Sequence, residues 1–397
     1  MTPLAITGVG ITCALGTGAE EFFAAMKKGP RRLSERGPGQ GVAKTPIQSF
    51  KGAPYEGREL PIVEVPSFDP TKYLGDKGLR TLDRLTKLLI VAARLCLADG
   101  GFKNDNQWAH GAPERVGVCC SNAYGSLEAI TELDRVAKLE DARYINPAKF
   151  PNTVSNSASG YVSIWEDLRA LNVSVSDGNC GALDAVACSD IFLATARADA
   201  ILTGGGEAMS EALYLAFEKL GALGLDQTTR LGEGAAFLAL ETRATAQARN
   251  AKIYGEVTGY GTSFVAPKEE TTLLFASRVA IERAIAQALA DAGIDATAVD
   301  VVASGLSGLA QFDDEERAAI VATVGERAIA APKLALGETL GAGGALGMAC
   351  ALAWFDGAPV TPLVAGTAPK REKLDTVLVT SIGYYGNASA LVMRRAS

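Results

Sequence analysis

The side chain best suited to covalent chemistry is that of Cys180, and its neighbour Asn179 competes with it for the same position. They lie in a turn, 177–180, between an apolar strand predicted over 173–175 and a helix rich in small residues. A strand that turns sharply into a helix exposes the residue at the turn and points unpaired N–H groups at whatever binds there. A thiol in such a place can act as a nucleophile. The stretch 173–210 therefore predicts a functional turn, and leaves open which of the two residues serves it.

Histidine chemistry is almost excluded, because the chain holds one histidine, His110, in a polar loop. General acid–base catalysis and metal sites depend heavily on histidine. The seven cysteines show no paired spacing and lie mostly in apolar runs, as is typical of reduced, buried thiols in a cytoplasm. Cys119-Cys120 reads as a buried strand end, since no other ligands cluster with it. We expect no metal and no cofactor.

The composition is that of an ordinary globular protein, with 397 residues, 48% hydrophobic and 21% charged residues, and a net charge of −7. The negative charge argues against nucleic acid or an anionic membrane as a partner. It leaves room for an acidic carrier protein that docks on a local basic patch. No apolar run reaches the ~20 residues that span a bilayer, and no signal peptide is apparent. We therefore expect a cytoplasmic protein without a membrane partner.

The elements that position the turn alternate between strands and helices, which indicates an α/β fold with mainly parallel sheets covered on both faces. The two halves share one outline, so we expect a duplicated α/β unit with halves 1–252 and 253–397. An exposed loop is expected over 31–57. Strands are expected at 4–9, 116–120, 173–175, 232–241, 253–262, 299–303, 376–380 and 388–393, and helices at 19–26, 79–99, 127–139, 155–171, 212–220, 243–249, 272–292, 314–324 and within 337–355.

A series of glycine-rich motifs runs through the whole chain in a characteristic order. In this order the sequence resembles the β-ketoacyl synthases of fatty-acid and polyketide biosynthesis. The resemblance implies a thiolase fold, in which duplicated βαβ halves give a layered αβαβα architecture. The motifs are Ile6-Thr7-Gly8-Val9-Gly10, Phe150-Pro151-Asn152-Thr153-Val154 with Asn156, Gly204-Gly205-Gly206-Glu207, Gly232-Glu233-Gly234-Ala235 with Leu240-Glu241, Lys252-Ile253-Tyr254 through Gly259-Tyr260-Gly261, Gly341-Ala342-Gly343-Gly344 and Ser381-Ile382-Gly383-Tyr384.

Synthases of this family use a cysteine nucleophile and two histidines that stabilise an enolate. The resemblance places Ser304, in the run Ser304-Gly305-Leu306-Ser307-Gly308, at the first histidine position, and Glu338 at the second. Lys333, which precedes the second position, is kept. A carboxylate at 338 repels an enolate that an imidazole would stabilise, so the family's condensation chemistry is not expected of this chain alone.

At the nucleophile position, an ungapped alignment from Gly204 backward places Asn179 rather than Cys180. Using Cys180 requires a deletion inside a helix, and a one-residue slip turns every helix position by about 100°. We therefore favour Asn179, which is no nucleophile but is a good turn and N-cap residue.

In the residues at and after position 179, the sequence resembles the chain-length factors, which are catalytically silent partners of ketosynthases. They carry an amide at the nucleophile position, and their next residues are similar to the run 181–185 here. Ile382 stands where synthases keep a gating phenylalanine, which makes Ile382, Gly383 and Tyr384 candidate pocket residues. The resemblance implies a non-catalytic subunit that pairs with an active ketosynthase, through the strand at 173–175, shapes the acyl tunnel and meets an acyl carrier protein.

Two other functions stay open. Cys180 could serve an acyltransferase or thioester hydrolase, because a thiol at a helix N-terminus can be reactive. Alternatively, the chain is a homodimer that binds an acyl chain without a ketosynthase partner. Structural roles compete at each position: Asn179 as a helix cap, Cys180 as a packing residue, and Lys333 with Glu338 as a buried ion pair.

Overall fold

The computed structural model describes residues 1–35, 62–223, 229–269, 271–272, 274–370, 372 and 374–396. The loop predicted over 31–57 lies outside these residues from position 36 onward. The main sheet contains β1 (Leu4–Cys13), β2 (Gly16–Thr17), β6 (Val116–Ser121), β7 (Asn172–Val175), β8 (Ala200–Glu207), β10 (Gly234–Thr242), β11 (Gly255–Phe264), β12 (Val301–Ala303), β13 (Ala328–Ala330), β14 (Leu363–Ala365), β15 (Thr376–Ile382) and β16 (Asn387–Arg395). The longer helices are α1 (Ala19–Lys27), α3 (Arg84–Asp99), α4 (Leu127–Val136), α5 (Ser157–Glu166), α6 (Gly181–Ala194), α7 (Glu211–Lys219), α8 (Arg243–Ala248), α9 (Arg278–Ala292), α10 (Ala310–Val324) and α12 (Gly343–Phe355).

The two halves of the sheet repeat one pattern of pairing. In the first half, β7, β6 and β8 are parallel neighbours, and β10 and β1 follow antiparallel. In the second half, β13, β12 and β15 are parallel, and β16 and β11 follow antiparallel. β1 joins the halves by pairing with β11 at Leu4–Ile6. This repetition confirms the predicted duplication, while the exact boundary between residues 252 and 253 stays a prediction.

The prediction of mainly parallel sheets is wrong for the centre of the sheet, where β8, β10, β1, β11, β16 and β15 pair antiparallel. Connection length explains one of these pairs, β15 with β16, whereas alternation of helices and strands does not reveal which of the other strands become neighbours. Parallel neighbours need a crossover, usually a helix, whereas a short turn can only return the chain antiparallel. β15 ends at Ile382 and β16 begins at Asn387, so these strands form a hairpin.

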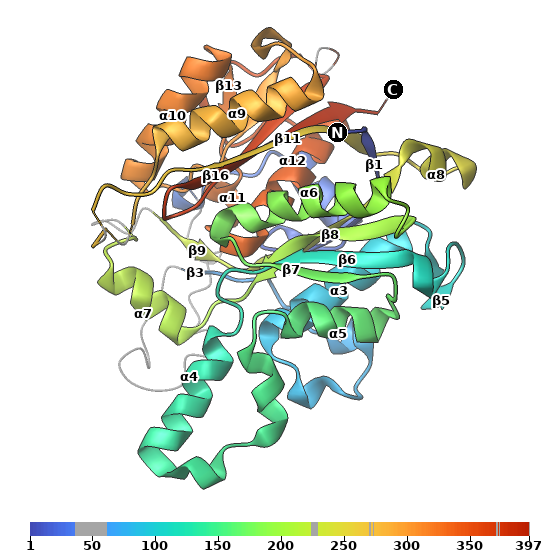
Figure 1. The fold of residues 1–397 in the computed structure, drawn as a ribbon, viewed down its shortest axis with the longest axis vertical. Helices are drawn as coiled ribbons and strands as arrows, with labels where there is room; N and C mark the ends of the chain where they lie inside the picture. The colour runs from blue at the N-terminus through green and yellow to red at the C-terminus, as the bar shows by residue number, and fades with distance from the viewer. Residues whose placement is uncertain are drawn as a thin grey trace.

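The helices divide into three layers around the two halves of the sheet (Figure 1). α3 and α5 cover the outer face of the first half, and α9 and α10 cover the outer face of the second. α6 and α12 lie between the halves and contact strands of both. All 13 residues of α12 are buried, because a helix between two sheets has no solvent-facing side. The predicted αβαβα layering is thereby confirmed.

The strand–turn–helix–strand unit predicted around 173–210 forms as β7, α6 and β8. Several predicted helices are shorter than expected, because side-chain caps fix where they begin. α3 begins after Asp83, whose carboxylate accepts a hydrogen bond from Thr86 N at 2.8 Å. α9 begins after Ser277, whose hydroxyl accepts from Ala280 N at 3.2 Å. α5 ends at Glu166, where Asp167 adopts a left-handed φ of 53°.

An arm projects from the layered body between β6 and α5 (Figure 1). It consists of α4, a π-helical segment at Ala137–Asp141, and two short 3-10 segments that end at Thr153. The arm exposes several large apolar side chains to solvent: Ile130, Leu139, Tyr144, Phe150 and, just beyond it, Val154.

Candidate functional site

The functional turn depends on Gly178, which has a left-handed φ of 56° that suits glycine. It lets the chain leave β7 and enter a 3-10 turn, Gly178–Cys180, directly before α6. Asn179 and Cys180 therefore both lie at the start of α6, and both are buried, with 2% and 0% of their surface exposed. The turn presents its side chains to the protein interior.

The amide of Asn179 is oriented by the strand opposite. Its Nδ2 donates to the backbone carbonyl oxygen of Ile382 at 3.0 Å, and the backbone carbonyl oxygen of Asn179 accepts from Ser381 Oγ at 2.6 Å. A carbonyl oxygen only accepts hydrogen bonds, so the NH₂ group must face Ile382, which fixes the amide orientation. Asn179 Oδ1 is buried, and no donor among the described residues lies within hydrogen-bond distance of it. One of the two donors of the amide is therefore used within the protein.

Cys180 is held as a protonated thiol. Its Sγ donates to the carbonyl oxygen of Ser381 at 3.3 Å. Burial raises the pKa of the Cys180 thiol well above its ordinary value, and the nearby carboxylates of Asp184 and Asp177 raise it further. Since the thiolate is the attacking species, this environment opposes nucleophilic chemistry.

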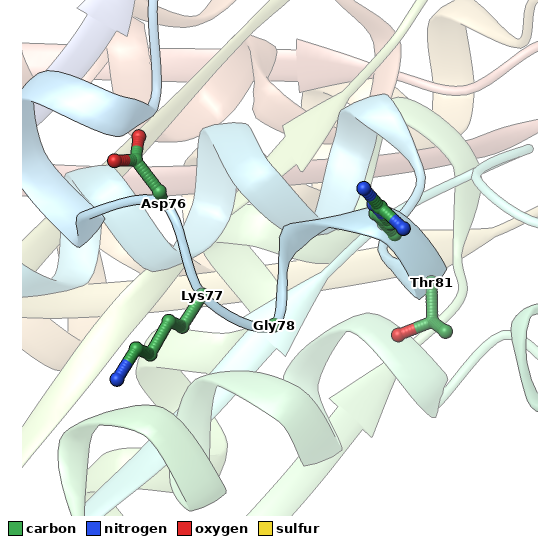
Figure 2. Close-up of a pocket in the computed structure, with 5 residues that line it drawn as sticks. Asp76, Lys77, Gly78 and Thr81 are labelled. Atoms are coloured by element: carbon green, nitrogen blue, oxygen red, sulfur yellow. The ribbon is translucent and has the colours of Figure 1, made fainter.

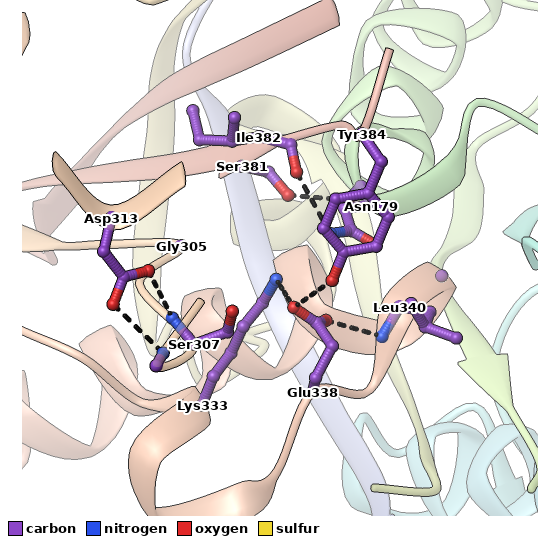
Figure 3. Close-up of polar contacts among 12 residues, drawn as sticks. Asn179, Gly305, Ser307, Asp313, Lys333, Glu338, Leu340, Ser381, Ile382 and Tyr384 are labelled. Atoms are coloured by element: carbon purple, nitrogen blue, oxygen red, sulfur yellow. Dashed lines mark hydrogen bonds and ion pairs between the residues drawn. The ribbon is translucent and has the colours of Figure 1, made fainter. Parts of the chain in front are cut away.

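Lys333 and Glu338 form the buried ion pair that the sequence allowed (Figure 3). Lys333 begins α11 (Lys333–Leu336), and its Nζ lies 2.9 Å from Glu338 Oε2. The lysine stem fits because position 343 is glycine: a Cβ there would lie 3.0 Å from Lys333 Cε. Oε1 of Glu338 accepts from the N–H of Leu340 at 3.0 Å. The ammonium is thus paired within the protein.

Tyr384 completes this arrangement from the β15–β16 hairpin. Its hydroxyl donates to Glu338 Oε2 at 3.0 Å, and Figure 3 shows its ring beside Asn179. The ring packs edge-on against Phe312 and Phe217, with centroid distances of 5.0 and 5.8 Å. Burial, and then the Glu338 carboxylate, raise the pKa of Tyr384 well above its ordinary value. The hydroxyl therefore stays protonated and committed to Glu338.

Ser304 lies at the end of β12 and is also turned inward. Its Oγ donates to the carbonyl oxygen of Ala330 at 2.8 Å, and 4% of its surface is exposed. Five of the predicted residues lie close together (Figure 3): Asn179, Ile382, Lys333, Glu338 and Tyr384. The loop that follows Ser304 lies beside this group, and two acidic residues described next bind its backbone. Gly383 lies in the hairpin turn, where a Cβ would meet Asn387 Oδ1 at 1.7 Å.

Sequence reasoning missed three acidic residues around this site: Glu316 and Glu207, which are buried, and Asp313, which is half-buried. Glu316 accepts from Gly305 N at 2.8 Å and Thr380 Oγ1 at 2.6 Å, while Asp313 accepts from Ser307 N and Gly308 N at 3.0 Å. Glu207 accepts from Ala123 N at 2.8 Å and Gly341 N at 3.4 Å. Burial raises the pKa of Glu316 and of Glu207 to about 7. An acidic residue ending a wholly apolar strand, as Glu207 does, is the signal that could have found it.

A second feature lies away from this cluster, between α2 (Thr71–Leu74) and α3 (Figure 2). It is an open hollow of about 370 Å³, lined by Asp76, Lys77, Gly78, Arg80 and Thr81. None of the site residues predicted from the sequence lines it. Its two cationic side chains give this part of an acidic protein a local basic character.

Within the described ranges, no three or more His, Cys, Asp and Glu side chains are grouped so that they could hold a metal ion. In the same part of the chain, no helix combines the length and the apolar character needed to cross a membrane.

A duplicated αβαβα fold with a buried strand–turn–helix site defines a thiolase-like condensing-enzyme scaffold. Residues 1–246 match the family model described as beta-ketoacyl synthase, N-terminal domain, and residues 254–365 match the beta-ketoacyl synthase, C-terminal domain. The chain therefore belongs to the beta-ketoacyl synthase family, and the resemblance seen in the sequence is confirmed.

Relatives from both fatty-acid and polyketide systems are similar over the whole length. The 3-oxoacyl-[acyl-carrier-protein] synthase 2 of Rhizobium meliloti (strain 1021) is 29% identical, over 100% of this chain and 99% of the relative. The tetracenomycin polyketide synthase ketoacyl synthase beta subunit of Streptomyces glaucescens is 29% identical, over 99% of this chain and 98% of the relative.

Solved structures show the same fold. The structure described as the ishigamide ketosynthase/chain length factor aligns over 100% of both chains, with a TM-score of 0.84 and 23% identity. A beta-ketoacyl synthase from Burkholderia phymatum STM815 also aligns over 100% of both chains, with a TM-score of 0.82 and 23% identity.

Proposed function

We propose that this chain is a non-catalytic, chain-length-factor-like subunit of a type II fatty-acid or polyketide synthase, which pairs with an active ketosynthase. The single observation that carries the proposal is that the polar side chains at and beside the family's reactive positions bind to other groups of this chain. Asn179 Nδ2 donates to Ile382, Ser304 Oγ to Ala330, Lys333 Nζ to Glu338, and Tyr384 also to Glu338.

Condensation needs an ionised nucleophile and donors aimed at a developing oxyanion. Asn179 supplies no nucleophile, and the Glu338 carboxylate opposes negative charge on a substrate. Removing one oxyanion donor costs typically 100- to 1,000-fold in kcat, and here each of these polar side chains binds within this chain. These features favour a silent subunit over a slow synthase.

Pairing with another subunit is supported by the edge of the sheet. β7 is the last strand in the described order of the sheet, and its residues are only partly buried. An unpaired edge offers N–H and C=O groups to a strand of another chain. α5 contacts both β7 and the last segment of the arm, and its Ile164 is 74% exposed, so exposed apolar side chains lie on elements that adjoin this edge. A solved relative is described as a ketosynthase/chain length factor, and we carry that pairing to this chain as a proposal.

An acyl carrier protein is proposed as the second partner. One structural relative is described as a type II PKS acyl-carrier protein in complex with its ketosynthase. On this chain, Lys77 and Arg80 at the open hollow between α2 and α3 offer the local basic patch that an acidic carrier needs. All seven cysteines are free thiols, which suits the cytoplasmic location that we propose.

The deciding experiment compares condensation by this chain alone, by an active type II ketosynthase, and by the co-expressed pair, each with malonyl-carrier protein. We expect product only when the ketosynthase is present, and a change in product length when this chain is added. Condensation by this chain alone overturns the proposal. Elution of the two chains as separate species overturns the pairing and favours the homodimeric acyl-chain binder.

The alternative of an acyltransferase or thioester hydrolase through Cys180 finds little support in the geometry. The thiol is 0% exposed, donates to Ser381 and has a raised pKa. Incubation with an acyl thioester followed by intact-mass analysis tests it: an acyl adduct at Cys180 favours this alternative, and its absence favours the silent subunit.

A further inference from the structure

The reaction space of the family lies between the nucleophile position and the second histidine position, here Asn179 and Glu338. Tyr384 reaches both. Its hydroxyl donates to Glu338 Oε2 at 3.0 Å, and among the groups that act on its pKa, after burial and Glu338, is the Asn179 side chain. Figure 3 shows the ring extending from Asn179 toward Glu338. The side chain therefore bridges the gap that separates the two positions.

Tyr384 is held at its backbone and at its hydroxyl. The backbone carbonyl oxygen of Tyr384 accepts from Phe275 N at 2.7 Å, and the hydroxyl donates to the Glu338 carboxylate, which Lys333 also contacts. Edge-on contacts with Phe217 and Phe312 fix the plane between them. Swinging the ring aside leaves Glu338, which is 1% exposed, with one donor fewer, and such a loss is unfavourable for a buried charge.

We propose that Tyr384 is a fixed plug that closes the space between Asn179 and Glu338, so that this chain does not itself accept an acyl group there. This inference rests on the proposed silent-subunit function and deepens it. A growing acyl chain then lies in the partner subunit. This chain acts on the length of that acyl chain through surfaces other than the space between Asn179 and Glu338.

A reporter thiol tests the plug directly. Asn179→Cys places a cysteine at the nucleophile position, and intact-mass analysis follows its alkylation by a bromoacetyl-pantetheine probe that carries a decanoyl chain. The rate is divided by the rate with iodoacetamide, which corrects for thiol reactivity. The unsubstituted protein measures the background from its native thiols. We expect N179C to react slowly, and N179C/Y384A at least tenfold faster.

The matched control is N179C/Y254A. Tyr254 also donates its hydroxyl to a carboxylate, Asp99, at 2.8 Å, but lies against Phe23 in another part of the core. Its loss should leave the normalised rate unchanged. If Y384A does not fold, N179C/Y384F decides instead, because it keeps the ring and removes only the tie to Glu338. We expect its normalised rate to exceed that of N179C.

Equal normalised rates for N179C and the Tyr384 variants overturn the plug. The proposed function is tested separately, by condensation with a partner. If the pair condenses but Tyr384 variants do not change the normalised alkylation rate, the plug alone is refuted. If Tyr384 variants do change that rate but this chain condenses without a partner, the proposed function alone is refuted.

Discussion

Nζ of Lys333 lies 2.9 Å from Oε2 of Glu338, and both side chains are almost fully buried. The charges compensate each other only while both are present. We expect Lys333→Met to lower the free energy of unfolding by about 3–5 kcal/mol, because it leaves a buried carboxylate without its counter-charge. The double variant K333M/E338Q should recover much of this loss. Urea unfolding measures both.

The control for the ion pair is Arg278→Ala, which removes an exposed pair with Glu282 on α9. Exposed pairs contribute little, so the unfolding midpoint should hardly move. A loss in K333M no larger than in R278A contradicts the assignment of a stabilising buried pair.

Stability should fall as the pH rises from 5 to 8, and Glu207 should contribute to this fall. Burial raises its pKa from 4.5 to about 7 in the folded protein, so the folded state binds the proton more tightly than the unfolded state. The stabilisation is complete below the unfolded pKa and is lost as the pH rises through 7. The difference between the folded and unfolded pKa of Glu207 corresponds to roughly 3 kcal/mol of folding free energy. Urea unfolding at several pH values should show a shallower slope for Glu207→Gln; an unchanged slope refutes this origin.

Thiol accessibility should follow burial. Cys188 is the one cysteine of the seven that is not fully buried, whereas Cys180 is completely enclosed. Brief treatment of the native protein with iodoacetamide should label Cys188 first and leave Cys180 unmodified, as read by peptide mapping. Denatured protein, in which all seven thiols react, is the control. Early labelling at Cys180 is incompatible with the packing role described for it.

The apolar surface beside β7 should carry the subunit contact. Phe150→Asp or Ile164→Asp places a charge where large side chains are 64% and 74% exposed. Apolar anchors in an interface are worth about 2 kcal/mol or more, so pairing should weaken roughly 30-fold. Sedimentation velocity measures it. Val321→Asp, on the outer helix α10 and 44% exposed, is the matched control; if it weakens pairing equally, the contact lies elsewhere.

The basic patch should govern carrier binding. Reversing both charges with K77E/R80E should weaken binding of an acyl carrier protein about tenfold, since each exposed contact is worth up to about 1 kcal/mol. The effect should shrink at high salt, because exposed charges are screened. Lys28→Glu, at the exposed end of α1, is the control. Equal binding by the double variant and the unsubstituted chain rules out this patch as the docking site.

Much of the fold was predictable because its signals are local. The strand–turn–helix at 173–194 follows from an apolar run, a glycine that permits the turn, and a helix of small residues. The Lys333–Glu338 pair joins residues five positions apart on one short segment. The order of the glycine motifs along the chain carried the family resemblance.

The arrangement of the site was not predictable, because it depends on contacts between distant segments. Asn179 Nδ2 meets Ile382 203 positions away, and Tyr384 meets Glu338 across 46 positions. Only the assembled sheet brings the hairpin over the turn, and this contact decides which end of the amide faces inward. The antiparallel centre was missed for a similar reason, since alternation of helices and strands does not reveal which strands become neighbours.

The first strand has a consequence for how the protein is made. All ten residues of β1 are buried, yet apart from the two-residue β2 its partner strands, β10 and β11, begin only at Gly234 and Gly255. Ribosomes add about 5–20 residues per second. The nascent chain therefore carries an apolar segment without its partners for on the order of ten seconds or more, which makes its amino terminus a target for chaperones during translation.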